Sequence, residues 1–302
     1  MNKKIIIILL YISLIAGFFY FVMTHDDMVK ALSQVSVFWL AMVILVKLLV
    51  QVANGYRYYV LLFFEKIYLP FHVWLPLSCV GTLQNVVLPG NTAVMTKGVY
   101  LKKKFSLAYK PYFLLTLTGI VLFIMSNAIV IFMMQSYLAA QLQQLLYVLL
   151  VFSIVFISVM AWLNVTSAFQ DNKFMGYLNA IKHHVLAPVN TPVVIRVILS
   201  EWVLIVVRSL AMWTCFAAFA YLPSVVEMVI ISIVVTFSSI VNLTPGNIGV
   251  TESVIIGLSL LYGIPFEVAV AASVLSRITS IISQVMVAIV YGKNLVDASA
   301  NI

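Results

Sequence analysis

The sequence predicts an all-α polytopic membrane protein with about six full spans and two re-entrant helical hairpins in an inverted-repeat architecture. Three observations predict this fold class. Hydrophobic residues make up 64% of the 302 residues, charged residues make up only 9%, and the long apolar runs are of two kinds, uninterrupted or broken by Pro, Gly and Asn. A soluble domain carries about 25% charged residues, because polar groups must cover its surface. The composition therefore excludes a soluble globular protein.

The full spans follow from runs long enough to cross a hydrocarbon core about 30 Å thick, which takes about 20 helical residues. The first run, residues 5–23, is longer than the apolar core of a signal peptide and has no small-residue cleavage site before His25. We therefore expect it to be a retained span. The other predicted spans cover residues 35–64, 109–134, 144–163, 193–221 and 266–291.

The charges of the loops predict the orientation. The chain has a net charge of +8, and most of its positive loop residues lie in residues 102–104 (Lys102, Lys103 and Lys104), in the loop 164–192 and at Lys293, whereas 24–34, 135–143 and 222–227 hold little positive charge. Positive loops stay in the cytoplasm, so we expect a multi-pass protein of the cell membrane with both termini cytoplasmic. No basic stretch resembles a nucleic-acid groove, so we expect membrane lipids and no nucleic acid as partners.

The two interrupted runs, residues 70–101 and 225–263, contain similar motifs about half the chain length apart. Each motif begins Pro-Gly-Asn, and each has an asparagine a few residues upstream. Pro removes an amide donor and Gly frees the backbone, so each motif should break its helix. The predicted hinge residues are Pro89, Gly90, Pro245, Gly246 and Gly249.

Broken helices survive in hydrocarbon only where protein buries the loosened backbone or where it lines a watery cavity. Two breaks at corresponding places in two halves of opposite orientation point to a transporter binding site. We therefore expect one membrane domain, 1–302, made of approximate halves 1–143 and 144–302, whose two hairpins meet near the midplane. The alternative is a pair of kinked spans that bind no ligand.

Three charges lie at depth in this arrangement: Arg208 and Arg277 near the centres of predicted spans and Glu252 in the second broken run. Each ion costs roughly 2.5–3.5 kcal/mol at the bilayer centre, so all three should face the interior and be paired or hydrated. In a purely structural interpretation, Glu252 forms an ion pair with Arg277 or with Arg208. In the functional interpretation, the arginine that is left over binds a lipid phosphate. The predicted substrate-binding residues are Arg208, Glu252, Arg277, Lys97, Asn91, Asn247, Asn85 and Asn242, where each asparagine contacts ligand or only caps a broken helix.

Four other charged residues have less specific readings. Lys47 lies about 10 residues inside the second span. Its side chain is either functional or snorkels to the membrane surface. Arg57 and Arg196 lie near predicted cytoplasmic ends and read as interface anchors. Glu201 shares a helix face with Arg208, but about 10 Å separates the two residues, so it would extend a polar track rather than pair with that arginine.

No catalytic or metal-binding motif is present, and the longest polar stretch, 164–192, is too short to fold alone as a catalytic domain. Cys79 and Cys215 both lie in apolar runs, which disfavours a disulfide or a thiolate metal site. We therefore expect no enzyme, no catalytic residue, no metal and no cofactor.

The second motif resembles the membrane region of the lysylphosphatidylglycerol synthase family. That family's second repeat reads approximately Pro-Gly-Gly-x-Gly-x-x-Glu, followed by a helix that is rich in small residues and carries an Arg. Here Asn247 stands where the family usually has Gly. The matching residues are Pro245, Gly246, Gly249, Glu252 and Arg277.

The first motif departs more from the family pattern. Asn91, Ala93 and Val94 stand at its usual Arg, Gly and Glu, and Lys97 takes the place of a later cation. The resemblance implies a lipid flippase-like membrane domain, which in larger members is fused to a soluble aminoacyl-transferase domain. This chain has no such domain in its sequence, so the resemblance does not carry lysine transfer with it.

These observations predict a flippase that translocates an anionic lipid or a polyprenyl-phosphate-linked intermediate across the cytoplasmic membrane. The alternative is a membrane subunit or scaffold of a glycosyl- or aminoacyl-transfer system. Its partners would be lipids with anionic headgroups and, in the alternative, a lipid-modifying transferase.

Overall fold

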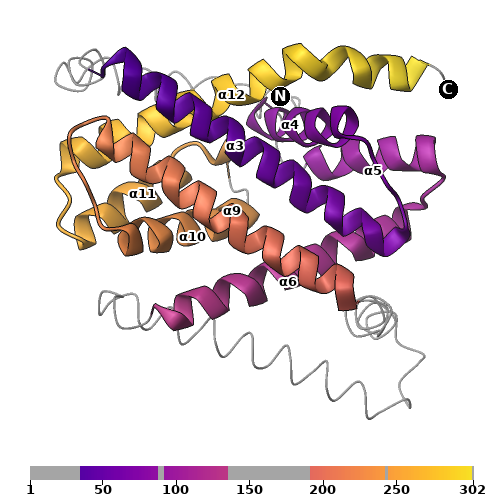
Figure 1. The fold of residues 1–302 in the computed structure, drawn as a ribbon, viewed down its shortest axis with the longest axis horizontal. Helices are drawn as coiled ribbons and strands as arrows, with labels where there is room; N and C mark the ends of the chain where they lie inside the picture. Colours follow the sequence, from indigo (N-terminus) through magenta and orange to yellow (C-terminus); the bar gives the residue numbers. More distant parts are fainter. Residues whose placement is uncertain (1–34, 88–91, 135–190, 242–243, 301–302) are drawn as a thin grey trace, which may run out of the picture. The chain divides into compact units, whose positions relative to one another are not determined.

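The computed structural model describes residues 35–87, 92–134, 191–241 and 244–300 (Figure 1). Over these residues the chain forms eight α-helices, two short 3₁₀ helices and no strand. The predicted all-α class is therefore confirmed for the described part of the chain. Several predictions fall outside it, namely the spans 5–23 and 144–163, most of the loop 164–192, and the residues Pro89, Gly90, Asn91 and Asn242.

Three helical segments are long and apolar enough to cross a membrane. The first joins α3 (Val37–Leu61) to the 3₁₀ helix η1 (Leu62–Glu65), the second is α6 (Tyr109–Met133), and the third is the part of α12 (Phe266–Ala300) up to Tyr291. They confirm apolar helices of spanning length at the predicted spans 35–64, 109–134 and 266–291. The predicted span 193–221 corresponds to α9 (Thr191–Ala217), a 27-residue helix about 40 Å long.

Both interrupted runs form pairs of short helices. The first run contains α4 (Phe71–Val87) and α5 (Thr92–Phe105). The second contains α10 (Val225–Val241), the 3₁₀ turn η4 (Pro245–Asn247) and α11 (Val250–Leu261), and α10 packs against α11.

These helices have 12 to 17 residues, so they are about 18–26 Å long and shorter than the hydrocarbon core. The helix break at the second Pro-Gly-Asn motif was correctly predicted, whereas the first motif lies outside the described residues. The total of six spans, the re-entrant placement and the inverted repeat stay predictions.

The chain forms two compact units, each assembled from separated segments of sequence. Unit 1 contains residues 1–51, 79–93 and 206–288, and unit 2 contains residues 52–78, 94–205 and 289–302. Each unit contains residues of both predicted halves, 1–143 and 144–302. The division of the chain into two repeated halves therefore stays a prediction.

Aromatic packing and small residues shape unit 2. The Trp74 ring stacks on the Tyr59 ring, with centroids 5.9 Å apart and planes inclined by 14°. On α3, Gly55 leaves room for this indole: a Cβ there would lie 2.7 Å from its Cε3 and Cζ3 atoms. The close approach of α3 and α4 in unit 2 therefore requires glycine at position 55.

We expect Gly55→Ala to lower the free energy of unfolding by about 1–3 kcal/mol, because the new methyl group collides with an indole that is itself buried and stacked. The measurement is a denaturant titration in mixed micelles. Gly257→Ala is the matched control, because a Cβ at that helical position has no atom within 4 Å, and alanine favours a helix by about 1 kcal/mol. Equal stability of the two variants would contradict the packing argument.

Candidate functional site

The break between α10 and α11 in unit 1 is a turn with left-handed backbone. The φ angles are 57° at Gly246, 53° at Asn247 and 83° at Gly249. Glycine adopts such angles without a steric penalty, and asparagine is among the side-chain-bearing residues that tolerate them best. This explains why either Gly or Asn suits position 247, where the sequence departs from the family pattern.

Side chains within this segment hold the turn. The Thr244 hydroxyl donates to the Ile248 carbonyl at 2.8 Å, and the Asn247 side-chain amide donates to the Ser238 carbonyl at 3.0 Å. The Gly249 amide donates to Glu252 Oε2 at 2.8 Å, so this carboxylate caps the start of α11. Here the Asn247 side chain binds protein backbone, which matches the capping reading of that residue.

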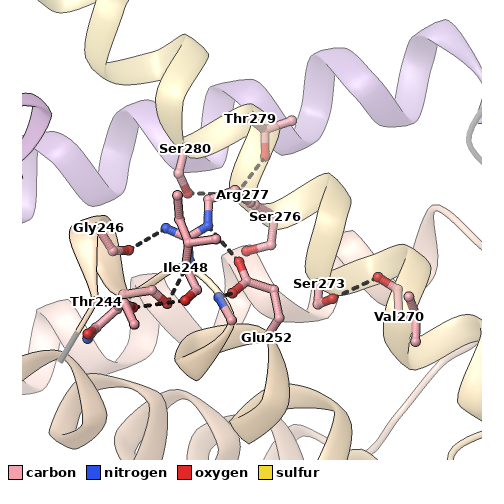
Figure 2. Close-up of polar contacts among 12 residues, drawn as sticks. Thr244, Gly246, Ile248, Glu252, Val270, Ser273, Ser276, Arg277, Thr279 and Ser280 are labelled. Atoms are coloured by element: carbon pink, nitrogen blue, oxygen red, sulfur yellow. Dashed lines mark hydrogen bonds and ion pairs between the residues drawn. The ribbon is translucent and has the colours of Figure 1, made fainter. Parts of the chain in front are cut away.

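Arg277 extends from α12 to the same turn (Figure 2). Its Nε donates to Glu252 Oε1 at 2.6 Å, its Nη1 to the Gly246 carbonyl at 2.6 Å and its Nη2 to the Asn247 carbonyl at 3.2 Å. All three guanidinium nitrogens and both Glu252 oxygens are therefore used within the protein. The ion pair between Glu252 and Arg277 forms, and it also supplies donors to carbonyls that the helix break leaves without helical partners.

Two more cations, Lys47 and Arg208, lie in unit 1 near the ion pair of Arg277 and Glu252. Lys47, on α3, is 8% exposed, and its Nζ donates to the Ser276 hydroxyl at 2.7 Å. Arg208, on α9, donates from Nη1 to the Thr236 hydroxyl at 3.1 Å. The Lys47 ammonium is close enough to both guanidinium groups, those of Arg208 and Arg277, for electrostatic repulsion. The three cations thus form one group, which we call the cation cluster.

Carboxylates are scarce around the cation cluster. Among the described residues of unit 1, Glu252 is the buried one. Glu227 and Glu267 lie in the first turns of α10 and α12, where Glu227 accepts the Ser224 amide and Glu267 is exposed. Such positions favour acids because they face the positive end of the helix dipole. The buried and half-buried residues around the cluster, in the described part of unit 1, therefore carry more positive than negative charge.

A polar seam joins α3 to α12 in unit 1. Lys47 and Gln51 are one turn apart on α3, and they donate to Ser276 and Ser283, two turns apart on α12, at 2.7 and 3.3 Å. This seam was not predicted, although serines spaced seven residues apart in an apolar helix were a visible signal. For Lys47 the sequence left two interpretations, a functional residue or a side chain that snorkels to the surface. In the structure its ammonium is held inside the protein.

The remaining predicted site residues have separate surroundings. Asn85 Oδ1 accepts the Ala93 amide at 2.9 Å, so it caps the start of α5 across the first break. Lys97 belongs to unit 2, where its ammonium lies 4.3 Å from the centroid of the Tyr58 ring. Whether Lys97 joins the other predicted site residues stays a prediction, as does the meeting of the two motifs.

Unit 2 holds an ion pair that the sequence analysis did not predict. Arg57 Nη1 lies 2.7 Å from Glu201 Oε1, and Glu201 is 1% exposed. Arg57 was read as an interface anchor and Glu201 as part of a track with Arg208, but each has the other as its ion-pair partner. Arg196, also read as an anchor, is exposed and lies 5.9 Å from the centroid of the Phe63 ring.

The chemistry of these residues suits binding of an anion. Lysine and arginine are donors only, and a guanidinium matches the geometry of phosphate oxygens. Among the described residues, no three His, Cys, Asp or Glu side chains are grouped so that they could hold a metal ion. The arrangement can therefore hold negative charge inside apolar helices, and its hydroxyl groups can complete the coordination.

Comparison with known proteins places these features in a family context. A family model described as "Lysylphosphatidylglycerol synthase TM region" matches residues 6–288. A UPF0104 membrane protein of Methanothermobacter thermautotrophicus is 35% identical over 101 residues, which span 32% of this chain and 28% of that protein. No solved structure gives a significant match.

We expect Arg277→Gln to lower the free energy of unfolding by about 3–5 kcal/mol, because it leaves the Glu252 carboxylate buried without a cation and two carbonyls without donors. The double variant Arg277→Gln, Glu252→Gln should lose less than the sum of the two single variants. Arg196→Gln, at an exposed position, should change stability by less than about 1 kcal/mol. Strictly additive losses at 252 and 277 would show that the pair is not energetically coupled.

The turn makes a second prediction, at Asn247. Asn247→Ala and Asn247→Gly both remove the hydrogen bond to the Ser238 carbonyl, but only alanine is strained at a φ of 53°. Asn247→Gly should therefore be the more stable variant by about 1 kcal/mol. Denaturant titrations of the two proteins side by side measure the difference. A more stable alanine variant would mean that the backbone at 247 is not left-handed.

Proposed function

The chain belongs to the lysylphosphatidylglycerol synthase TM-region family, and from this premise we propose that it is a lipid flippase. Its substrate would be an anionic lipid or a polyprenyl-phosphate-linked intermediate, moved across the cytoplasmic membrane. The helices long enough to span a bilayer support a site of action within the membrane. The chain would be multi-pass with both termini in the cytoplasm, as the positive loops favour.

The observation that carries the proposal is the cation cluster. Three cations lie together in unit 1 among apolar helices, and Glu252 is the buried carboxylate beside them in the described residues. Charges in such surroundings are costly and mark substrate pathways in membrane proteins. An anionic headgroup that entered the cluster would offset the mutual repulsion of Lys47, Arg208 and Arg277.

The contacts divide the three cations by role. Arg277 is committed to the turn through its bonds to Glu252, Gly246 and Asn247. Arg208 and Lys47 donate to the hydroxyls of Thr236 and Ser276, which are neutral acceptors. A phosphate oxygen adds the attraction of an opposite charge that a hydroxyl oxygen lacks, so it can replace either hydroxyl. We therefore assign headgroup binding to Arg208 and Lys47, and positioning to Arg277.

Movement of the headgroup would follow from the two broken runs. Short helices that end inside the membrane give a polar headgroup a protein-lined path, while its tails stay in lipid. In this scheme the hairpins are re-entrant, and rocking of one half of the chain against the other exposes the binding residues to each side in turn.

A second candidate is a membrane subunit or scaffold of a lipid-modifying transfer system. The family description favours it, because it names the membrane region of a synthase. A scaffold would not bind headgroups through the cation cluster. Neutral replacement of Arg208 would then leave function intact, and activity would require a partner enzyme.

The test is a transport assay with the purified full chain in liposomes. We expect tail-labelled phosphatidylglycerol to cross the bilayer faster than tail-labelled phosphatidylcholine with the same acyl chains. Arg208→Gln should slow the anionic lipid about tenfold to a hundredfold, because a hydrogen bond to a charged group is worth about 1.5–3 kcal/mol. The assay follows quenching of label in the outer leaflet by dithionite.

Arg196→Gln is the matched control, because it removes an exposed guanidinium from the same helix. Its rate should equal that of the wild type. Equal rates for wild type and Arg208→Gln, or no movement of either lipid, would contradict the flippase. Activity that appears only after a transferase is added would favour the scaffold instead.

A further inference from the structure

The Lys47 ammonium is the least satisfied cation of the cluster. The side chain is more than nine-tenths buried, and in the described part of the chain the Ser276 hydroxyl is its hydrogen-bond acceptor. An ammonium has three N–H bonds, so two of them have no acceptor in the described residues. Its electrostatic neighbours are Arg208, Arg277 and the Cys215 thiol. Two unused donors in a buried position indicate a place for oxygen atoms of a ligand.

The nearby carboxylate cannot serve this ammonium. Both oxygens of Glu252 are occupied, one by the Arg277 guanidinium and the other by the Gly249 amide. Glu227 and Glu267 lie in the first turns of α10 and α12, where Glu227 accepts the Ser224 amide and Glu267 is exposed. Lys47 therefore gains a counter-ion only from outside the described residues of unit 1.

The charge of the cluster indicates what that counter-ion is. Among the described residues, the three cations of the cluster and the Glu252 carboxylate leave two positive charges in excess. A ligand with one negative charge would neutralise half of this excess. A ligand with two negative charges would neutralise all of it and would offer oxygens to Arg208 and to Lys47 together.

We infer that the headgroup is a phosphate monoester, bound as a dianion through Lys47 and Arg208, in preference to a monoanionic phosphodiester. The inference rests on the proposed function and narrows it, because it chooses lipid phosphates over lipids such as phosphatidylglycerol. The shared chemistry is a terminal phosphate on an apolar tail. The tail is either diacylglycerol or a polyprenyl chain, and the test includes one arm for each.

The experiment uses the full chain in liposomes and three tail-labelled probes: phosphatidic acid, phosphatidylglycerol and a polyprenyl monophosphate. At pH 8 a phosphate monoester carries close to two charges, because its second pKa is about 6. We expect the monoesters to move about tenfold faster than phosphatidylglycerol, which corresponds to about 1.4 kcal/mol. At pH 5 the monoesters carry one charge and this preference should disappear. Phosphatidylglycerol keeps one charge at both values, so its rate reports any effect of pH on the protein.

Variants at position 47 test the residue directly. Lys47→Met keeps the length of the side chain and removes the charge, so the ratio of monoester to phosphatidylglycerol rates at pH 8 should fall to near one. Lys47→Arg restores the charge and should restore the ratio, which a loss of folding would not do. Lys110→Met is the matched control, because it removes an exposed lysine at the start of α6 in unit 2 and should leave the ratio unchanged.

The outcomes separate the two proposals. Equal rates for monoesters and phosphatidylglycerol at pH 8, or a ratio that Lys47→Met does not change, would overturn the monoester inference and leave the flippase in place. Movement of no anionic lipid would overturn the flippase, and the inference with it. Faster movement of phosphatidic acid alone, or of the polyprenyl phosphate alone, supports the inference and identifies the tail.

Discussion

Hydrocarbon offers no hydrogen-bond partners, so a broken helix inside a membrane needs partners from the protein itself. The turn at residues 245–249 has such partners within unit 1. The left-handed angles at Gly246 and Asn247 turn their carbonyls away from helical partners, and the Arg277 side chain donates to both carbonyls. Glu252 balances the charge of that arginine and caps the helix that follows. Without these bonds of Arg277 and Glu252, an open turn between α10 and α11 would leave carbonyl groups without donors, at a high cost in free energy.

This use of Arg277 decides what the other charges can do. A guanidinium that already binds a carboxylate and two carbonyls has little capacity left for a ligand. From the sequence, Arg208 and Arg277 were equal candidates for phosphate binding. The geometry separates them, and it adds Lys47, whose partner is a hydroxyl group. With Glu252 paired to Arg277, the positive excess among the described residues of the cluster belongs to Arg208 and Lys47.

The sequence predicted the fold as far as hydropathy and helix breakers can. The spans at 35–64, 109–134 and 266–291 were recognised because long apolar runs leave few alternatives in a membrane protein. The break at residues 245–247 was recognised because Pro and Gly act locally. The pairing of Glu252 with Arg277 was one of two options, since both arginines lay at similar depth. The contacts of Lys47 with Ser276 and of Arg57 with Glu201 were not predicted, because 229 and 144 residues separate the partners and only tertiary packing brings them together.

The two ion pairs, each between a buried glutamate and a partly exposed arginine, differ in how completely they are satisfied. Arg277 and Glu252 join consecutive helices, Arg57 and Glu201 join helices 144 residues apart, and each pair lies within one unit. In unit 1 both Glu252 oxygens and all three Arg277 nitrogens have partners. In unit 2 the Glu201 Oε2 and the Arg57 Nε are buried and have no hydrogen-bond partner among the described residues.

A fully satisfied polar network rigidifies its surroundings, whereas a half-satisfied one recovers less of the cost of desolvating its charges. The pair of Arg277 and Glu252 therefore fixes the turn in one geometry. The pair of Arg57 and Glu201 holds its helices by a single contact between charges, so it opens at a lower cost. The sequence gives both pairs the same two residue types, and only the surrounding donors and acceptors make one of them rigid.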